Sequence, residues 1–196
     1  MLASASGIRR RLLENAGIDF SVIPANVDET IIRRTLLAND NVPDPVDVAE
    51  ILARAKVQDV ALRDRDKVII AADQVLSFDG KIFEKPRDFN EARADLLAFS
   101  GHTHSLHSAV VLAMQGEIVW SHTDTVRITM RRLSPDFVKR YLENAGPKVF
   151  TSVGCYEIEG TGIHLIEDIE GDYFTALGLP LLALMDALRR NDIIEQ

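Results

Sequence analysis

The sequence predicts an α/β protein built on a mixed sheet, and three observations carry this prediction. Segments with helical periodicity alternate with segments typical of strands, and Asp79-Gly80 separates two strand candidates in the manner of a hairpin turn. The chain has 196 residues, enough for one sizeable core and a single domain, 1–196, with room for two lobes. We find no internal repeat and no low-complexity tract in it.

Apolar or alternating segments bounded by turn residues predict the strands. The apolar run 67–78 is turned by Asp79-Gly80 into a hairpin with the segment that begins at Lys81. Two long candidates, 107–114 and 117–130, meet at "QGE". The remaining strand candidates lie within 2–5, 20–30, where the strand leads into an acidic turn, and 162–171.

Caps and apolar spacing predict the helices. Ser6 can cap a helix over 7–15, and Ser134 followed by Pro135 can begin another that ends near Gly146. Apolar residues at positions i, i+3, i+4 and i+7 from Val48 predict a helix over 46–62. Two further helices are expected at 89–99 and 179–190. The segment between the second strand and the second helix, 31–47, carries two prolines and is expected to be a loop.

Composition narrows the class of partner. The formal net charge is −8, so the surface repels phosphate backbones, and we expect no nucleic acid polymer as partner. A small anionic ligand stays possible, because local charge can oppose net charge. The single Cys155 excludes an internal disulfide and suits a reducing compartment. No apolar run reaches the length of a membrane span, and the N-terminus lacks the order of a signal peptide. The sequence therefore predicts a cytoplasmic protein with no membrane association.

Asp73 is the polar residue that most needs an explanation. In "IIAADQVLSFDG", residues 69–80, it stands with Gln74 inside an apolar run, where an unpaired carboxylate is costly. Glu29, Lys56 and Lys85 are further charged residues beside predicted elements. If they converged on one cleft, the carboxylates could hold a divalent ion and the cations a polyphosphate. Spacing alone leaves open that they are surface or capping residues.

The start of the first helix raises a second question. Arg9, Arg10 and Arg11 crowd a helix end that already carries positive partial charge. Either an anion such as phosphate joins them there, or they form a solvated arginine cluster, and both alternatives stay open.

Three other features have an ordinary explanation beside a functional one. Cys155 suits a buried strand position better than a nucleophile, because no Cys-His signature accompanies it. His102 and His104 share one face of a strand, but no acid or cysteine cluster accompanies them as zinc ligands would require. Asp172 could support a metal site or cap the turn in which it lies, and Tyr156 could pack or face a ligand.

Eight motifs, taken together, resemble the Maf family of nucleoside triphosphate pyrophosphatases. They stand in family order over nearly the whole chain and read "LASAS" with "RR" at 2–10, "VDE" at 27–29, "ARAK" at 53–56, "AADQV" at 71–75, "KP" at 85–86, "SGHTH" at 100–104, "GCYEIEGTG" at 154–162 and "IEGDYFTALGLPL" at 169–181. The resemblance implies a Maf/ITPase-like fold, in which a twisted, partly antiparallel sheet is flanked by helices and a central cleft separates two lobes. It also implies a homodimer.

The resemblance further implies hydrolysis of a nucleoside triphosphate to its monophosphate and pyrophosphate, with Mg²⁺ or Mn²⁺ as cofactor. By the family pattern Asp73 is the proton acceptor, expected at a strand end and partly desolvated, and Glu29 binds the metal or positions water. Asp73 and Glu29 are thus the implied metal ligands. The set implied to hold the phosphates is Ser4, Arg9, Lys56 and Lys85.

Departures from the family pattern bear on the base. Gly7 and Ile8 replace a proline and an arginine, and Glu84 replaces a glycine before Lys-Pro. Gln74 with Glu159 resembles the branch that acts on 7-methyl-GTP, although Ile8 cannot stack on a base as the usual aromatic residue would. A carboxylate can accept hydrogen bonds from the N–H groups of guanine. The alternatives are a dTTP, UTP or broad-range pyrophosphatase, and a nucleotide-binding regulator of septum formation with weak or no catalysis.

Overall fold

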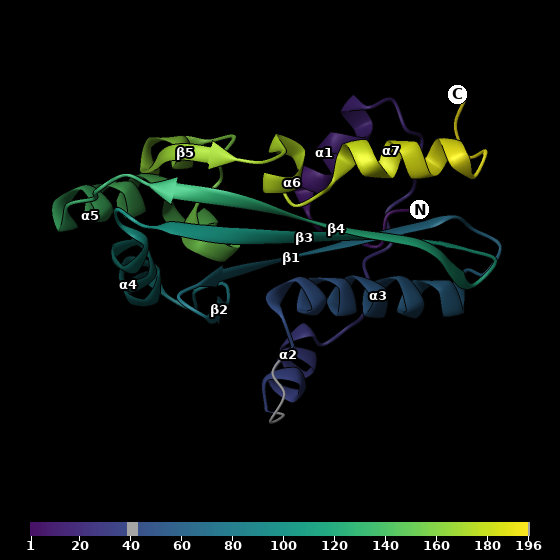
Figure 1. Ribbon diagram of the computed structural model, residues 1–196, viewed down its shortest axis with the longest axis horizontal. Coiled ribbons are helices and arrows are strands. Elements are labelled where there is room, and N and C mark those ends of the chain that lie inside the picture. Colours follow the sequence, from purple (N-terminus) through teal and green to yellow (C-terminus); the bar gives the residue numbers. More distant parts are fainter. Residues whose placement is uncertain (39–42, 196) are drawn as a thin grey trace.

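The computed structural model describes residues 1–38 and 43–195 and confirms the α/β class (Figure 1). Its five-stranded sheet has the order β2-β1-β3-β4-β5, and all four pairings are antiparallel. Parallel pairing occurs, among the described residues, as isolated bridges from Leu2 to Val22 and Ile70. The strands are β1 (Ile69–Phe78), β2 (Lys81–Phe83), β3 (Thr103–Met114), β4 (Glu117–Met130) and β5 (Ile166–Glu170).

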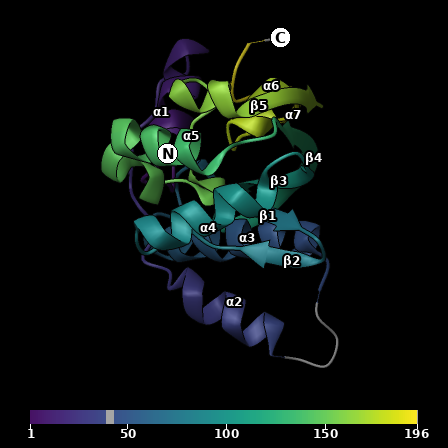
Figure 2. The same ribbon diagram turned by 90° about the vertical axis from the view of Figure 1, so that its left-hand side faces the viewer.

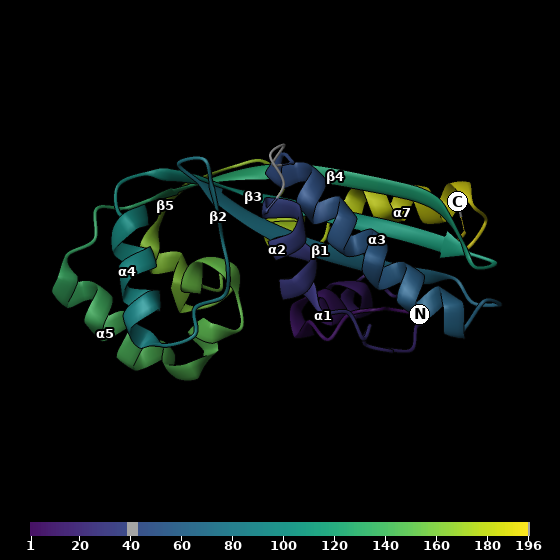
Figure 3. The same ribbon diagram turned by 90° about the horizontal axis from the view of Figure 1, so that it is seen from below.

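Helices cover both faces of this sheet (Figure 2). In Figure 1, α2 and α3 lie on one side of the strands, and α1, α6 and α7 lie on the other. Seen from below, α4 and α5 gather at one end of the long strands, and α1, α3 and α7 at the other end (Figure 3). The helices are α1 (Gly7–Asn15), α2 (Glu29–Leu37), α3 (Pro45–Arg63), α4 (Phe89–Phe99), α5 (Pro135–Ala145), α6 (Tyr173–Ala176) and α7 (Leu181–Arg190), and short 3₁₀ segments cover Gly146–Phe150, Val153–Cys155 and Thr161–Leu165.

Local sequence explains several of these boundaries. Asp79 and Gly80 both have positive φ, as a two-residue turn between β1 and β2 requires, and this confirms the predicted hairpin. The hydroxyl of Ser6 accepts a hydrogen bond from the N–H of Arg9, and the hydroxyl of Ser134 accepts one from the N–H of Phe137. These are the two predicted N-caps.

Strand β1, which lies between β2 and the central strand β3, has buried side chains on both faces, and their alternation divides the core in two. Ile69 and Ala71 face α3, while Ile70 and Ala72 belong to the larger cluster on the opposite face. The same alternation points the next two side chains in opposite directions. It therefore directs Asp73 toward α3 and Gln74 toward α6.

Four predicted elements are wrong in part. The strand expected over 2–5 is reduced to isolated bridges at Leu2. The strand expected over 20–30 is reduced to a bridge at Val22, and Pro24 two residues later cannot donate to a ladder. The loop expected over 31–47 contains most of α2 and the start of α3, while 39–42 lie outside the described residues. The first half of the strand expected over 162–171 is a 3₁₀ turn, and only Ile166–Glu170 pairs with β4.

The overlooked helix α2 has a clear local cause. The carboxylate of Asp28 accepts a hydrogen bond from the N–H of Ile31 at 2.9 Å, so this acidic residue is an N-cap. Ile32 and Leu36, four residues apart, pack against the core cluster beneath α3. Tertiary packing of one apolar side thus stabilises a helix of only nine residues.

Phe99 supports the end of the sheet that carries α4. It is fully buried, with its ring 4.9 Å from that of Phe83 and 5.5 Å from that of Phe78. We expect Phe99→Ala to lower the free energy of unfolding by about 3–5 kcal/mol through loss of burial and creation of a cavity. Denaturant unfolding measures the change, and Phe89→Ala, at a ring 44% exposed, is the matched control with a smaller effect. Equal losses in the two variants would contradict this assignment.

Candidate active site

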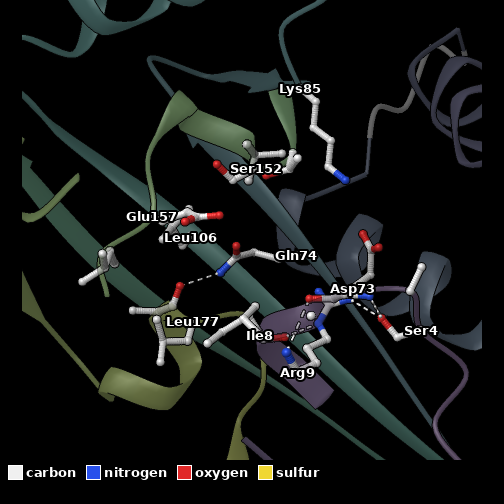
Figure 4. A pocket seen from close by; sticks show the side chains of 18 of the residues that line it. Ser4, Ile8, Arg9, Asp73, Gln74, Lys85, Leu106, Ser152, Glu157 and Leu177 are labelled. Atoms are coloured by element: carbon white, nitrogen blue, oxygen red, sulfur yellow. Dashed lines mark hydrogen bonds between the residues drawn. The ribbon is translucent and has the colours of Figure 1, made fainter. Parts of the chain in front are cut away.

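A pocket of about 700 Å³ brings the predicted site residues together (Figure 4). Its walls come from α1, α2, α3 and β1 at one end of the sheet and from segment 150–159 at the other. Its volume is typical of small-molecule sites. All the residues singled out in the sequence as catalytic or substrate-binding line it, namely Ser4, Ile8, Arg9, Glu29, Lys56, Asp73, Gln74, Lys85 and Glu159.

A gap along one edge of β1 positions this pocket. Before the gap, the N–H of Ala3 donates to the carbonyl of Ile70 at 2.8 Å, and after it Leu76 pairs with Phe83 of β2. Asp73 and Gln74 lie between these two contacts, where that edge of β1 pairs neither with the N-terminal segment nor with β2. The expectation that Asp73 ends a strand is therefore wrong. The strand continues past it on the side of β3, and only its outer edge is open.

Lys56 joins the two carboxylates expected at the centre of the site. Its ammonium nitrogen lies 2.5 Å from Oδ1 of Asp73 and 2.7 Å from Oε1 of Glu29. Lys56 and Asp73 are buried, at 9% and 4% exposure, and a charge in such a place requires a partner. The second oxygen of Asp73, Oδ2, is buried without a hydrogen-bond partner among the described residues.

Glu29 stands in the first turn of α2 and has two cationic neighbours. Arg33, one turn along the helix, donates from Nη2 to Oε2 of Glu29 at 2.8 Å. Burial raises the pKa of Glu29, but Lys56, Arg33 and Lys85 together outweigh burial and hold that pKa below its ordinary value. Glu29 is therefore a carboxylate at neutral pH. The sequence reasoning missed Arg33 because it missed α2, although the spacing of four residues was a signal.

Arg9 is buried and is held mainly by the backbone. Its Nε donates to the carbonyl of Gly178 at 2.8 Å, and Nη1 donates to the carbonyl of Ala72 at 2.8 Å and to the hydroxyl of Ser4 at 3.3 Å. Burial lowers its pKa, while Asp73 and Glu29 act in the opposite direction. Gly178 has a φ of +92°, and a Cβ there would lie 3.4 Å from Nη2 of Arg9. The turn after α6 and the start of α1 thus fix the guanidinium together.

The three arginines at the start of α1 were expected either to bind an anion or to form a solvated cluster, and the structure shows both environments. Arg9 is buried in the pocket, whereas Arg10 is exposed and pairs with Glu14 at 2.7 Å, as a solvated arginine does. Arg11 lines the pocket and reaches Glu159 at 3.3 Å. Only part of the cluster therefore faces a ligand site.

Lys85 reaches the pocket from the segment after β2, and its side chain extends inward in Figure 4. It makes no salt bridge within the described ranges 1–38 and 43–195. Burial lowers its pKa first, and the charges of Arg9 and Lys56 lower it further, against Glu29 and Asp73. An anion that enters the pocket would therefore stabilise the charged form of Lys85.

Gln74 presents an acceptor to the opposite end of the pocket. Its amide nitrogen donates to the carbonyls of Ala176 at 3.0 Å and Thr175 at 3.3 Å and to the hydroxyl of Ser108 at 3.0 Å. Two carbonyl partners fix the orientation of the amide, so Oε1 is left for a ligand.

Asp172 accepts from the N–H and the hydroxyl of Thr175, at 2.7 and 2.9 Å, and is the cap of α6.

The remaining lining of this end is mixed. Glu159 stands at the rim, and Ile8 contributes apolar surface. The sequence analysis did not place Ser152, Leu106, Leu177 or Glu157 in the pocket. For Glu157 the only signal was its position two residues before Glu159 in the same motif.

Two ordinary explanations hold outside the site. Cys155 is fully buried, as expected, but it stands in the 3₁₀ segment Val153–Cys155 and not in a strand. Burial raises the pKa of its thiol to about 12, so it is not a reactive nucleophile. His104 bonds through Nε2 to the hydroxyl of Tyr156 at 2.6 Å. Within 1–38 and 43–195 no group of three or more His, Cys, Asp and Glu side chains could hold a metal, so the zinc alternative has no support.

The carboxylates still suit a metal that arrives with a phosphate. Magnesium is commonly held by one or two carboxylates together with phosphate oxygens and water, so three protein ligands are not needed. Oδ2 of Asp73 is a buried, unpartnered acceptor in the pocket wall, and Glu29 is a carboxylate beside it on Lys56. These two residues therefore fit a divalent ion.

Fold and site together define an α/β protein with a pocket that is cationic at one end and rich in acceptors at the other. The chain belongs to the Maf family, since a sequence model of that family, described as "Maf-like protein", matches residues 1–191. A "7-methyl-GTP pyrophosphatase" of Brucella suis is 47% identical over 195 residues, covering 100% of this chain and 97% of that protein. A "Nucleoside triphosphate pyrophosphatase" of Paramagnetospirillum magneticum is 49% identical over 191 residues, covering 97% of each.

A solved structure is also similar, more distantly. It is the nucleoside-triphosphatase, or dITP/XTP pyrophosphatase, of Mycobacterium abscessus, with a TM-score of 0.39 and 18% identity over 99% of this chain and 97% of that one. The family assignment rests on the family model and the closer relatives.

We expect the stability of the protein to depend on pH through His104, which is buried and bonded to Tyr156. Burial lowers the pKa of His104 from 6.5 to about 4, so the folded protein keeps this ring neutral while the unfolded chain protonates it. Stability from this source is present at pH 7 and is lost as the pH falls from 6.5 toward 4. Between pH 7 and pH 5 the wild type should lose about 2 kcal/mol more free energy of unfolding than His104→Gln. Denaturant titrations at both pH values measure the difference, and equal losses would contradict it.

Proposed function

We propose that this protein is a nucleoside triphosphate pyrophosphatase that hydrolyses its substrate to a monophosphate and pyrophosphate, with 7-methyl-GTP as the preferred nucleotide. One observation carries the proposal, namely that a single pocket combines a cationic end, built around Lys56, Lys85 and Arg9, with an acceptor-bearing end at Gln74. The printed names of relatives 44–49% identical to this chain support the same reaction.

The cationic end suits a triphosphate. Arg9, Arg33, Lys56 and Lys85 line it against the two carboxylates Glu29 and Asp73, so it is locally positive in a protein of net charge −8. The hydroxyl of Ser4, already a partner of Arg9, adds a donor. Phosphoryl transfer gains mainly from positioning and from neutralising charge on non-bridging oxygens, which these side chains supply.

Asp73 is the residue best suited to activate water. Its Oδ1 is held by Lys56, which fixes the carboxylate, and its Oδ2 is free to accept the proton of a water molecule. The water oxygen then bonds to the α-phosphorus, and the bridging oxygen leaves with pyrophosphate. Lys56 and Lys85 stabilise the charge that develops on the phosphate oxygens.

We further propose that Asp73 and Glu29 hold Mg²⁺ or Mn²⁺ as the cofactor. Such an ion, when bound, neutralises phosphate charge and polarises the bond that breaks. Glu29 remains ionised at neutral pH, and Arg33 fixes its second oxygen, so its carboxylate is preorganised for this role.

The acceptor-bearing end suits a guanine base. Oε1 of Gln74 and the carboxylate of Glu159 can accept from N–H groups, which guanine offers at N1 and at its exocyclic amine. A negative carboxylate also favours the positive charge of a 7-methylated ring. Thymine and uracil present one N–H between two carbonyls and fit this lining less well.

The compartment, the domain organisation and the oligomeric state are proposed from the composition and the family resemblance. We place it in the cytoplasm as a single domain of 196 residues, in keeping with its one cysteine, and expect a homodimer from the family resemblance. No helix in the described parts of the chain is long and apolar enough to cross a membrane.

A nucleotide panel tests the reaction directly. With Mg²⁺ or Mn²⁺ present, we expect pyrophosphate and a monophosphate as products and the highest kcat/KM for 7-methyl-GTP. Enzyme-coupled detection of pyrophosphate, with inorganic phosphate measured in parallel, distinguishes the bond that breaks. Release of inorganic phosphate would overturn the assigned reaction, and a higher kcat/KM for dTTP or UTP would overturn the assigned base.

Asp73→Asn tests the proton acceptor. The amide keeps the shape of the side chain but cannot take a proton from water, so kcat should fall by at least about a hundredfold. Nucleotide binding, measured by calorimetry, and the far-ultraviolet circular dichroism spectrum should change little. Near-normal turnover in this variant would reject Asp73 as the base.

A further inference from the structure

We propose that Glu157, which stands two residues before the motif glutamate, is a second acidic residue that selects the base. This inference rests on the proposed function and deepens it by naming a specificity residue. Glu157 lines the pocket and is half-buried, and in Figure 4 its carboxylate points into the same space as the amide of Gln74.

Glu157 has its carboxylate available for a ligand. Its side chain takes part in no hydrogen bond or salt bridge in 1–38 and 43–195, whereas Glu159 is engaged by Arg11 at 3.3 Å. Glu159 is also an exposed residue, whereas Glu157 is half-buried. Of the two acids in this loop, Glu157 is therefore the one that no cation of the described chain neutralises by contact.

The backbone around Glu157 is fixed on both sides. Before it, the hydroxyl of Ser152 donates to the carbonyl of Tyr156 at 2.9 Å, and His104 anchors the ring of Tyr156. After it, the N–H of Gly160 donates to the carbonyl of Glu157 at 3.1 Å.

Close packing on the far side of the turn restricts the same residue. A Cβ on Gly162 would lie 2.5 Å from the carbonyl oxygen of Glu157, so only glycine allows this turn to close. The carboxylate is thus presented from a rigid turn, which reduces the entropy lost when it binds a ligand.

The chemistry of the facing groups defines the ligand. The ionised carboxylate of Glu157 and Oε1 of Gln74 are both hydrogen-bond acceptors. Neither side chain offers a donor to the space between them. A base that inserts there must bring donors, as guanine does with N1–H and its amine. A base with a delocalised positive charge gains further, because the carboxylate opposes that charge in a partly desolvated pocket.

Glu157→Gln tests this inference with minimal change of shape. It removes the negative charge and replaces one acceptor with a donor, so KM for 7-methyl-GTP should rise about tenfold, while kcat stays within about twofold. For UTP, which offers one N–H and no positive charge, kcat/KM should change less than about twofold. The ratio of the two kcat/KM values therefore falls about tenfold. Glu167→Gln, on exposed β5, is the matched control for loss of one negative charge and should leave that ratio unchanged.

The measurement distinguishes failure of this inference from failure of the proposed function. Turnover of 7-methyl-GTP by wild type with an unchanged ratio in Glu157→Gln would overturn the role of Glu157 alone. If wild type hydrolyses no nucleotide, the proposed function fails, and calorimetry with 7-methyl-GMP then decides the role of Glu157. A dissociation constant raised about tenfold in Glu157→Gln supports the role, and equal constants, or no binding by wild type, overturn it.

Discussion

The site depends on one buried ammonium group shared by two carboxylates. Lys56 extends from α3 and binds Asp73 on β1 and Glu29 at the start of α2, so three consecutive elements meet at a single nitrogen. Without this cation the two acids would face each other in a partly desolvated pocket, and their mutual repulsion would push them apart. The lysine therefore holds Asp73 and Glu29 close together and favours the ionised form of Glu29.

The second constraint is the open edge of β1. The N-terminal segment pairs with the strand near Ile70 and β2 pairs with it from Leu76, so a short stretch between them faces a ligand instead of another strand. Alternation within the stretch sends Asp73 and Gln74 to opposite faces of the sheet, yet the pocket reaches both because it lies around the edge. Two adjacent residues thus line different parts of one pocket.

Patterns confined to a few residues in sequence predicted much of this fold, and motifs predicted the residues that gather in the pocket. The cap at Ser6, the Asp79-Gly80 turn and the apolar spacing in α3 are local signals, and each gave the correct element. The misses are residues whose state depends on distant partners. Helix α2 is short and is stabilised by packing on α3, Arg33 enters the site only because that helix forms, and Glu157 faces the pocket because a tight turn aims it there. Local signals were present, namely the cap at Asp28 and the four-residue spacing of Glu29 and Arg33, but the contacts that bring these residues to the pocket come from distant partners.

The distribution of charge explains how an acidic protein can bind a polyanion in one orientation. A net charge of −8 opposes the approach of a polyanion to the surface as a whole. Inside the pocket the balance of charge is positive at the end that carries Lys56 and Lys85, and the burial of Lys56 strengthens its interactions. At the other end the carboxylate of Glu157 makes the balance negative again. A nucleotide entering with its base toward the cations would place its triphosphate against a carboxylate. Repulsion at one end and attraction at the other therefore favour the same orientation, the one that places the phosphates at the cationic end of the pocket.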